Sequence, residues 1–242
     1  MAVKTCGDGH YVKTVDANAR RAALARTQIF QALQPADIDL ILARAMVRRT
    51  SRGTAVLRRG DPGGGMVVIM SGRVRVSVIS EEGKEVTLSV LGHGEVLGEM
   101  SLLDGEPCSA DVTAQEDCVL LVIERSQFLN LLRSNSALCL HLMTLLTRRL
   151  RRANAALEDM ALLDLPGRLG RLLARLADDY GVPVRAGTRI EVKLSQKDLS
   201  TLVGASREKV NRQLRQWEDD GVLARDSGRM VVVNAQALAP LH

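Results

Sequence analysis

The chain has 242 residues, of which 46% are hydrophobic and 25% charged, and its formal net charge is +5. This composition supports a sizeable core and excludes a largely disordered chain, while no apolar run approaches the roughly 18 residues of a membrane span. The first ten residues, MAVKTCGDGH, lack the apolar centre of a signal peptide, so we expect a cytoplasmic protein without a membrane partner.

The positive charge is concentrated in the C-terminal part. Residues 1–146 hold 16 basic and 16 acidic side chains, whereas the chain from Thr147 onward holds 17 basic and 12 acidic ones. Such an asymmetry is typical of a domain that binds a polyanion and is joined to a neutral domain. Charge alone does not distinguish DNA from RNA or from an anionic membrane surface.

The N-terminal part predicts a few helices followed by many short strands. The first ~17 residues are polar and aperiodic and predict a loose arm, and residues 18–45 suit two short helices, the second beginning at Pro35. Between Thr54 and Glu124, the runs VVIM, RVRVSVI, EVTLSVL and CVLLVIE alternate with glycine-rich turns. This pattern favours a jelly-roll or related closed β-structure, which can enclose a small ligand.

A short helix around 126–132 is followed by a predicted long helix over 136–160. Along it, apolar residues recur at alternating steps of four and three, which is the seam of a coiled coil and predicts a parallel homodimer. The alternative is a helix packed on its own barrel. Asp164 and Pro166 suit the start of the next helix, so we place a hinge there. The seam residues are Cys139, Met143, Leu146, Leu150, Ala153, Leu157 and Met160.

The strongest local signal is the segment from Ser195 to Val233, which predicts a winged helix-turn-helix. Ser195 suits the cap of a first helix, the pair Gly204 and Ala205 suits a tight turn, and Ser206 suits the cap of a second helix. The segments VLAR, DSG and RMVVV then predict a hairpin wing. The buried faces would hold Leu199, Leu202 and Val203 in the first helix and Val210, Leu214 and Trp217 in the second.

The outer face of the second helix carries side chains suited to reading base edges. Arginine pairs with guanine, glutamate accepts from cytosine, and asparagine pairs with adenine, which assigns base contacts to Arg207, Glu208, Asn211 and Arg212. Phosphate contacts suit Ser206, Lys209, Gln196 and Lys197. The alternative is an ordinary amphipathic helix pair with a solvated charged face.

With these residues, the chain resembles the Crp/Fnr family of transcription regulators from about Ile29 to Val233, and GASREKVNR resembles the family's recognition motif. The resemblance implies an α+β fold: an N-terminal jelly-roll β-barrel of the cyclic-nucleotide-binding type, a long dimerisation helix and a C-terminal winged helix-turn-helix. We expect these parts at 18–135, 136–163 and 164–242. Arg207, Glu208 and Arg212 would form the base-contacting trio.

The stretch GEVLGEMSLLDGEPCSA, from Gly94 to Ala110, resembles the phosphate-binding cassette of cyclic-nucleotide-binding domains. A glycine turn and a short helix present N–H groups to a phosphate, and a carboxylate binds the ribose hydroxyl. The resemblance assigns effector contacts in the cassette to Gly98, Glu99, Met100, Ser101, Cys108 and Ser109. On the long helix, the family's adenine-contacting positions correspond to Ala153 and Asn154.

Three residues, at two places in the chain, depart from the family pattern. Cys108 stands where the family has an arginine for the phosphate, and Ala153 with Asn154 stands where it has a pair of hydroxyls. Loss of a charge-assisted contact of about 1.5–3 kcal/mol weakens binding by roughly tenfold to over a hundredfold. Three alternatives therefore stay open: cyclic AMP (cAMP), another nucleotide such as cyclic GMP (cGMP) or cyclic di-GMP, and no required ligand.

Metal and redox sensing find little support in the sequence. The four cysteines are scattered, only Cys6 precedes the barrel, and no iron–sulfur or zinc spacing occurs. His93 lies in a Gly-His-Gly turn and suits a solvated side chain better than a metal or haem ligand. A redox role for Cys108 would require a stabilised thiolate. We expect no metal.

The mechanism that follows is allosteric. An effector in the barrel would shift the long helix so that two recognition helices reach successive major-groove faces of a pseudo-palindromic double-stranded DNA site, with RNA polymerase as a possible further partner. A nucleotide-processing enzyme that uses Glu99 or Cys108 is a rival hypothesis, but no nucleophile, base and orienting group converge, so we expect no catalytic residue. A cyclic-nucleotide-regulated module that acts on a protein partner leaves the helix-turn-helix unexplained.

Overall fold

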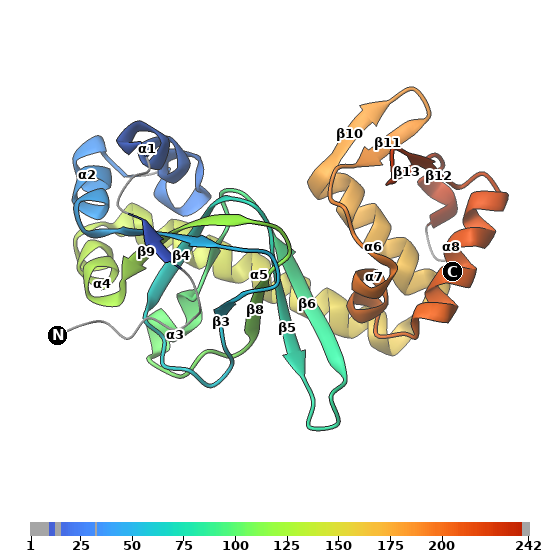
Figure 1. The fold of residues 1–242 in the computed structure, drawn as a ribbon, viewed down its shortest axis with the longest axis horizontal. Helices are drawn as coiled ribbons and strands as arrows, with labels where there is room; N and C mark the ends of the chain where they lie inside the picture. The colour runs from blue at the N-terminus through green and yellow to red at the C-terminus, as the bar shows by residue number, and fades with distance from the viewer. Residues whose placement is uncertain (1–9, 13–15, 32, 239–242) are drawn as a thin grey trace. The chain divides into compact units, whose positions relative to one another are not determined.

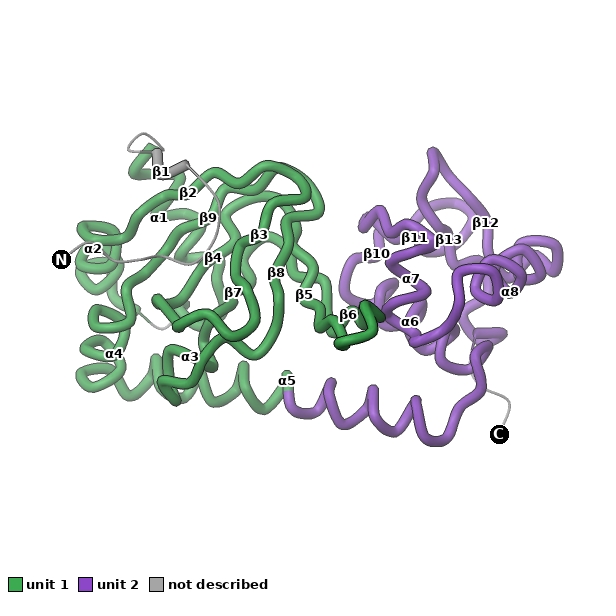
Figure 2. Tube along the Cα trace, turned by 60° about the horizontal axis from the view of Figure 1, so that its bottom comes forward, with its two compact units in different colours: residues 1–149 green, residues 150–242 purple. Residues whose placement is uncertain are grey.

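The computed structural model describes residues 10–12, 16–31 and 33–238. The chain forms two compact units, residues 1–149 and 150–242, coloured separately in Figure 2. The division falls inside the long helix α5 (Ser136–Leu162). The three functional parts expected from the sequence, residues 18–135 for the effector domain, 136–163 for the dimerisation helix and 164–242 for the DNA-binding domain, stay a prediction.

The first unit, at the left of Figure 1, is built on two antiparallel sheets. Their strand orders are β1-β2-β9-β4-β7 and β3-β8-β5-β6. The four β-type runs of the sequence lie in β4, β5, β6 and β9, as predicted. The expected loose arm is wrong at residues 10–12, which form β1 against β2, and its other residues up to 15 lie outside the described part of the chain. The strands are β1 (His10–Val12), β2 (Met46–Thr50), β3 (Ala55–Leu57), β4 (Gly65–Ser71), β5 (Val74–Ile79), β6 (Glu85–Leu91), β7 (Val96–Leu97), β8 (Asp111–Ala114) and β9 (Cys118–Glu124).

Strand β9 lies between β2 and β4 and has apolar residues on both faces. Leu121 and Ile123 join the cluster that packs under the helices, whereas Leu120 and Val122 join the cluster between the two sheets. Because successive side chains of a strand point to opposite faces, one continuous apolar run supplies both cores. The run CVLLVIE therefore marks the centre of the first unit.

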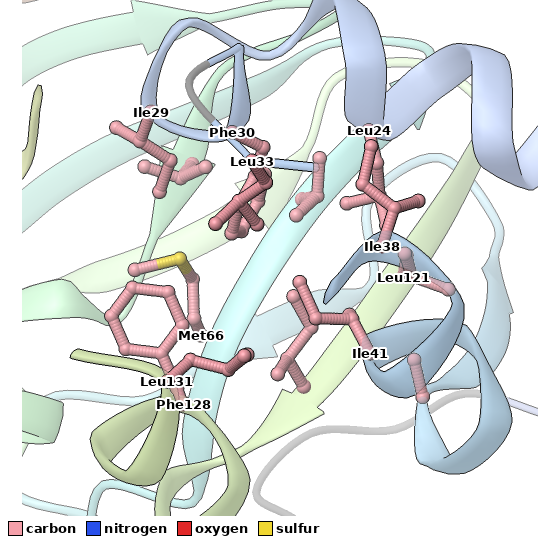
Figure 3. Close-up of a cluster of buried hydrophobic side chains, with 14 of the residues drawn as sticks. Leu24, Ile29, Phe30, Leu33, Ile38, Ile41, Met66, Leu121, Phe128 and Leu131 are labelled. Carbon is pink, nitrogen blue, oxygen red and sulfur yellow. The ribbon is translucent and has the colours of Figure 1, made fainter. Parts of the chain in front are cut away.

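Helices cover one face of the larger sheet. They are α1 (Ala17–Arg26), the 3-10 turn η1 (Gln28–Phe30), α2 (Pro35–Arg44), which begins at the predicted proline, and α4 (Arg125–Ser134). Phe30 and Phe128 meet edge to face with ring centroids 6.1 Å apart, and both are fully buried (Figure 3). Gln127 on α4 donates its amide to the carbonyls of Leu40 and Ile41 at 2.7 and 3.0 Å, which ties α4 to α2.

Helix α5 begins on this first core. Leu138 and Leu142 are buried in the same cluster as Phe30 and Phe128. His141 and Arg148 also contact η1, because the His141 ring bonds the Gln28 carbonyl at 2.8 Å and Arg148 donates to the Gln28 side chain at 2.8 Å. The N-terminal half of α5 is thereby held against the first unit.

The second unit has its own core, which includes Leu173, Ile190, Leu199, Leu214 and Leu223. Its sheet has the order β10-β11-β13-β12, and the β10–β11 hairpin has no counterpart among the predicted elements. No helix among the residues that the structure describes is long and apolar enough to cross a membrane. The elements are α6 (Leu165–Tyr180), β10 (Gly181–Val184), β11 (Gly187–Ile190), α7 (Gln196–Val203), α8 (Arg207–Asp219), β12 (Leu223–Asp226), β13 (Arg229–Val232) and η2 (Gln236–Leu238).

The predicted fold class is confirmed: a β-structured effector-type domain, a long helix of 27 residues and a C-terminal helix-turn-helix with a hairpin wing. Asp164 caps α6 by accepting from the Gly167 amide at 2.9 Å, and Pro166 lies in the first turn, as expected.

We expect Phe128→Ala to lower the free energy of unfolding of the first unit by about 3–5 kcal/mol, since it removes a fully buried ring and leaves a cavity against Phe30. Urea unfolding followed by circular dichroism measures the change. Leu88→Ala is the control, because Leu88 is 57% exposed and its loss should have little effect. Equal effects of the two substitutions would contradict the packing described.

Candidate nucleic-acid interface and effector cassette

Helix α7 begins in a capping box. The Ser195 hydroxyl accepts from the Asp198 amide at 3.1 Å, and the Asp198 carboxylate accepts from the Ser195 amide at 2.8 Å. The helix ends at Gly204, whose φ of 66° is in the left-handed region that glycine tolerates. The predicted cap and turn are both present, and they fix where the next helix starts.

Helix α8 is oriented by its buried stripe. Val210, Leu214 and Trp217 are buried at intervals of four and three residues, and Ser206 caps the helix by accepting from the Lys209 amide at 3.4 Å. The opposite side is exposed near the N-terminus of the helix. The exposed residues there are Arg207, Glu208, Lys209 and Arg212, together with the capping residue Ser206.

Asn211 differs from its neighbours on α8. It is half-buried, and its side-chain oxygen is enclosed without a hydrogen-bond partner among the described residues. A pair with adenine needs that oxygen as an acceptor for the base amino group. The predicted base contact by Asn211 therefore requires the amide to turn outward, which is not required of Arg207 or Arg212.

Two residues at the start of α7 lie beside this surface. The Gln196 side-chain oxygen accepts from both Nε and Nη2 of Arg207 at 3.4 Å, and Lys197 is exposed. A shallow hollow runs along the outer side of α8. It is lined by Glu208, Asn211, Arg212, Arg215, Gln216, Asp219 and Asp220.

The wing is tied to the neighbouring strand β11 by an arginine. Arg189 donates to Asp226 and to Glu191, both at 2.7 Å. The hydrogen bond from Arg189 holds the pKa of the Asp226 carboxyl below its ordinary value, and the same bond raises the pKa of Arg189. Ser227, at the tip between β12 and β13, has a φ of 50° in the left-handed region, which suits a tight hairpin. The predicted wing is present.

The cassette has the predicted glycine turn and short helix. Gly98, with φ 81°, precedes α3 (Glu99–Asp104), and Gly105, with φ 79°, ends it. A Cβ atom on Gly98 would lie 2.6 Å from the Gly65 carbonyl oxygen, so β4 and the cassette approach each other too closely for a side chain. Met100 is exposed on α3, whereas Glu99 and Ser101 are buried.

Glu99 is paired with an arginine that the sequence analysis did not identify. The Arg149 guanidinium, on α5, donates to the Glu99 carboxylate and to the Val96 carbonyl. The Glu99 side chain is only 4% exposed, so this pairing compensates a buried charge. Arg149 lies 50 residues further along the chain, inside the charged run RRLRR, where no local pattern marks it. The Arg149 side chain is 30% exposed.

Cys108 is held in place through its backbone. Its amide donates to the Asp61 carbonyl at 2.9 Å, and its carbonyl accepts from the Gly60 amide at 2.8 Å. Burial raises the pKa of the Cys108 thiol; a hydrogen bond with Ser101 lowers it to a smaller extent, and the Asp61 carboxylate raises it by less again. A neutral, buried thiol offers no positive charge to a phosphate and is a poor nucleophile.

The remaining candidate residues of the effector site lie on different parts of the chain. Ser109 is exposed and its hydroxyl lies 3.7 Å from the Met100 sulfur. Ala153 and Asn154 are exposed on the part of α5 that belongs to the second unit, so their contribution to an effector site stays a prediction. The His93 ring bonds the Met70 carbonyl at 2.6 Å, and within the described part of the chain no group of three metal-binding side chains gathers.

Comparison with known proteins matches both units. A model of the cyclic nucleotide-binding domain matches residues 47–135, and a model of the Crp-like helix-turn-helix domain matches residues 167–241. The cyclic AMP receptor protein of Thermus thermophilus is 33% identical over 210 residues, which cover 87% of this chain and 94% of that protein. The CRP-like cAMP-activated global transcriptional regulator of Mycobacterium tuberculosis is 29% identical over 216 residues, covering 89% and 96%.

Among solved structures, the c-di-GMP responsive global regulator CLP of Xanthomonas campestris is similar with a TM-score of 0.70 and 26% identity, covering 83% of this chain and all of that one. The relatives are transcription regulators, which confirms the expectation that this chain is no enzyme. With both domain models matched and with relatives aligned along nearly their whole length, this chain belongs to the Crp/Fnr family of DNA-binding transcription regulators.

Proposed function

We propose that the chain is a cytoplasmic homodimer that binds a pseudo-palindromic DNA site with one α8 helix from each subunit and responds to a nucleotide in its barrel. The observation that carries this proposal is the exposed N-terminal end of α8, where Arg207, Lys209 and Arg212 surround Glu208 while the opposite stripe is buried. A helix that presents its first turns in this way suits insertion into the major groove.

Within this interface we assign two kinds of contact. Arg207, Glu208 and Arg212 read base edges, since their side chains are exposed and offer a bidentate donor, an acceptor and a second bidentate donor. Asn211 joins them if its amide turns outward. Phosphate contacts fall to Ser206, Lys209, Gln196 and Lys197, which hold the helix in register without reading sequence.

The dimer is proposed to form along α5. Met143, Leu150, Leu157 and Met160 are 59, 62, 66 and 49% exposed, although they follow the coiled-coil spacing. Leu138 and Leu142, on another face of the same helix, are buried in the first core. An apolar stripe of this length is unfavourable in water and is the pattern of a helix that pairs with a second copy.

The effector is proposed to be a nucleotide bound at the cassette, with cAMP, cGMP and cyclic di-GMP as the candidates. The family relatives support this class: one is cAMP-activated, and a structural neighbour is responsive to c-di-GMP. Gly98 and the short helix α3 suit a phosphate, but neutral Cys108 replaces the arginine that would balance its charge.

A second candidate is a regulator that binds DNA without an effector. The observations that favour it are the buried thiol of Cys108 and the Glu99 carboxylate, which already has Arg149 as its partner. A ribose hydroxyl would have to share that carboxylate. RNA polymerase is the proposed partner in either case, since transcription regulators act on its recruitment. A module that acts on another protein would leave the exposed surface of α8 without a role.

We expect Arg207→Ala to cost about 1–3 kcal/mol of binding free energy and to relax the base preference at one position of the site. A DNA site is first selected from random sequences with the unaltered protein. The affinity of each protein is then measured by titration into this site and into its single-base variants. Lys209→Ala is the control, because loss of a phosphate contact should weaken all sequences equally and reduce the salt dependence. A uniform loss with Arg207→Ala would contradict base reading.

Leu157→Asp should convert the dimer to monomers, because two charges would be buried face to face in the seam. Sedimentation analysis measures the mass in solution. Leu162→Asp is the matched control: Leu162 is 73% exposed on the same helix but lies off the stripe, so this variant should stay dimeric. A Leu157→Asp variant with unchanged mass would show that the dimer forms elsewhere.

Cys108→Arg should tighten the binding of a cyclic nucleotide by roughly tenfold to over a hundredfold, since it restores a cation at the phosphate. Calorimetric titration of the dimer with cAMP, cGMP and cyclic di-GMP measures this. Cys108→Ser, which removes the thiol without adding charge, is the control and should bind as the unaltered protein does. Tight binding by the unaltered protein would name the effector. If neither the unaltered protein nor any variant binds a nucleotide, the result would favour a regulator that binds DNA without an effector.

A further inference from the structure

A buried carboxylate lies one turn before the end of α5. The Asp159 side chain is 5% exposed, and each of its oxygens accepts from a different arginine of α6: Arg171 at 2.6 Å and Arg175 at 2.8 Å. All three residues belong to the second unit. Arg171 and Arg175 are four residues apart, so they project from the same face of α6 and enclose the carboxylate together. We call these three residues the Asp159 clamp.

The clamp spans the turn that joins the two helices. Helix α5 ends at Leu162 and α6 begins at Leu165, with Asp164 as its cap. The Leu163 amide donates to the Asp159 carbonyl at 3.1 Å, which adds a last helical hydrogen bond at the same residue. A turn of this kind is covalently continuous but free to bend, because the residues around a cap can change their backbone angles. Three charged groups across it restrict that bending.

The restraint continues from α6 to the DNA-reading helices. Arg168 donates from Nη1 to the Leu163 carbonyl at 2.8 Å and from Nε to the Val203 carbonyl at 3.1 Å. Val203 is the last residue of α7, directly before Gly204 and the cap of α8. One face of α6 therefore connects the end of α5 to the end of α7, and α8 follows after a two-residue turn and its cap.

We propose that Asp159 is a positioning residue for DNA binding: its clamp makes the end of α5, the turn and α6 one rigid piece, so that α8 is held in a fixed orientation to the C-terminal part of its own long helix, residues 150–162. The inference rests on the proposed function, because a fixed α8 matters only where two of them must reach one DNA site together. The turn at Asp164, where the sequence placed the hinge, is then restrained by the clamp.

The burial of the clamp supports a role in orientation. A buried ion pair contributes little net stability over an apolar replacement, but it allows few alternative geometries because every charge must keep its partner. Arg171 and Arg175 are 35 and 44% exposed, so water can solvate them when Asp159 is neutralised. The loss should therefore loosen the turn without unfolding the unit.

The same two helices supply a matched control. Arg152 on α5 donates to Asp179 on α6 at 3.2 Å, but these side chains are 61 and 42% exposed. An exposed pair of this kind contributes little because both partners are hydrated when apart. Asp179→Asn thus makes the same chemical change between the same helices, where we expect no effect.

The first test measures hydrogen exchange in the full-length protein without DNA. Asp159→Asn should accelerate exchange of the Leu163 and Gly167 amides by about tenfold, while the Val210 amide in α8 stays protected. Asp179→Asn should change none of them. Unchanged exchange at Leu163 and Gly167 in Asp159→Asn would overturn the proposal. If Asp159→Asn does not fold, Arg175→Gln, which removes one partner only, takes its place.

The second test measures DNA binding on two duplexes: a full pseudo-palindrome selected by the unaltered protein, and the same duplex with one half-site scrambled. Asp159→Asn should bind the full site about tenfold more weakly and the single half-site within about twofold of the unaltered protein, because only the full site requires both α8 helices in register. An equal loss on both duplexes would overturn the positioning role. Absence of DNA binding by the unaltered protein would refute the proposed function, while the exchange result would still decide whether the clamp restrains the turn.

Discussion

The burial of Val210, Leu214 and Trp217 determines what α8 presents to its surroundings. These side chains occupy one stripe of a helix with 3.6 residues per turn, so the residues between them must point away from the core of the second unit. Arg207 and Arg212 are outward for that reason alone. The capping box at Ser195 and the left-handed turn at Gly204 set the position at which this stripe begins, and the surface that we propose binds DNA is a consequence of core packing.

The effector end of the molecule is governed by charge compensation. Glu99 is buried and needs a cation, and Arg149 supplies it from the long helix. Cys108 is buried as well, but burial keeps its thiol neutral, so no counter-charge is required there. A nucleotide phosphate entering this cassette would thus meet peptide N–H groups and a thiol in place of a guanidinium. The family fold is retained, while the side chain that we expect to face the phosphate is uncharged.

Much of the fold follows from local signals in the sequence. The caps at Ser195, Ser206 and Asp164 and the apolar run of β9 lie within a few residues of the structure they specify, and these predictions are confirmed. Three features were not predicted. The Glu99–Arg149 pair and the Asp159 clamp join residues that are distant in sequence, and the partial burial of Asn211 depends on how side chains pack around α8. No local pattern encodes such contacts, because charged residues at those spacings are equally consistent with a solvated face. The base and effector contacts of individual residues stay predictions, since they depend on ligands.

The position of the single tryptophan has a practical consequence. Trp217 is the only indole in the chain and lies in the core of the second unit, whereas the first core is built on Phe30 and Phe128. Indole emission therefore reports the solvent exposure of the C-terminal core alone, while far-ultraviolet ellipticity sums over both units. If the two units unfold together, both optical signals change at the same denaturant concentration. A difference between the two midpoints shows that the units unfold separately, and no label is needed to see it.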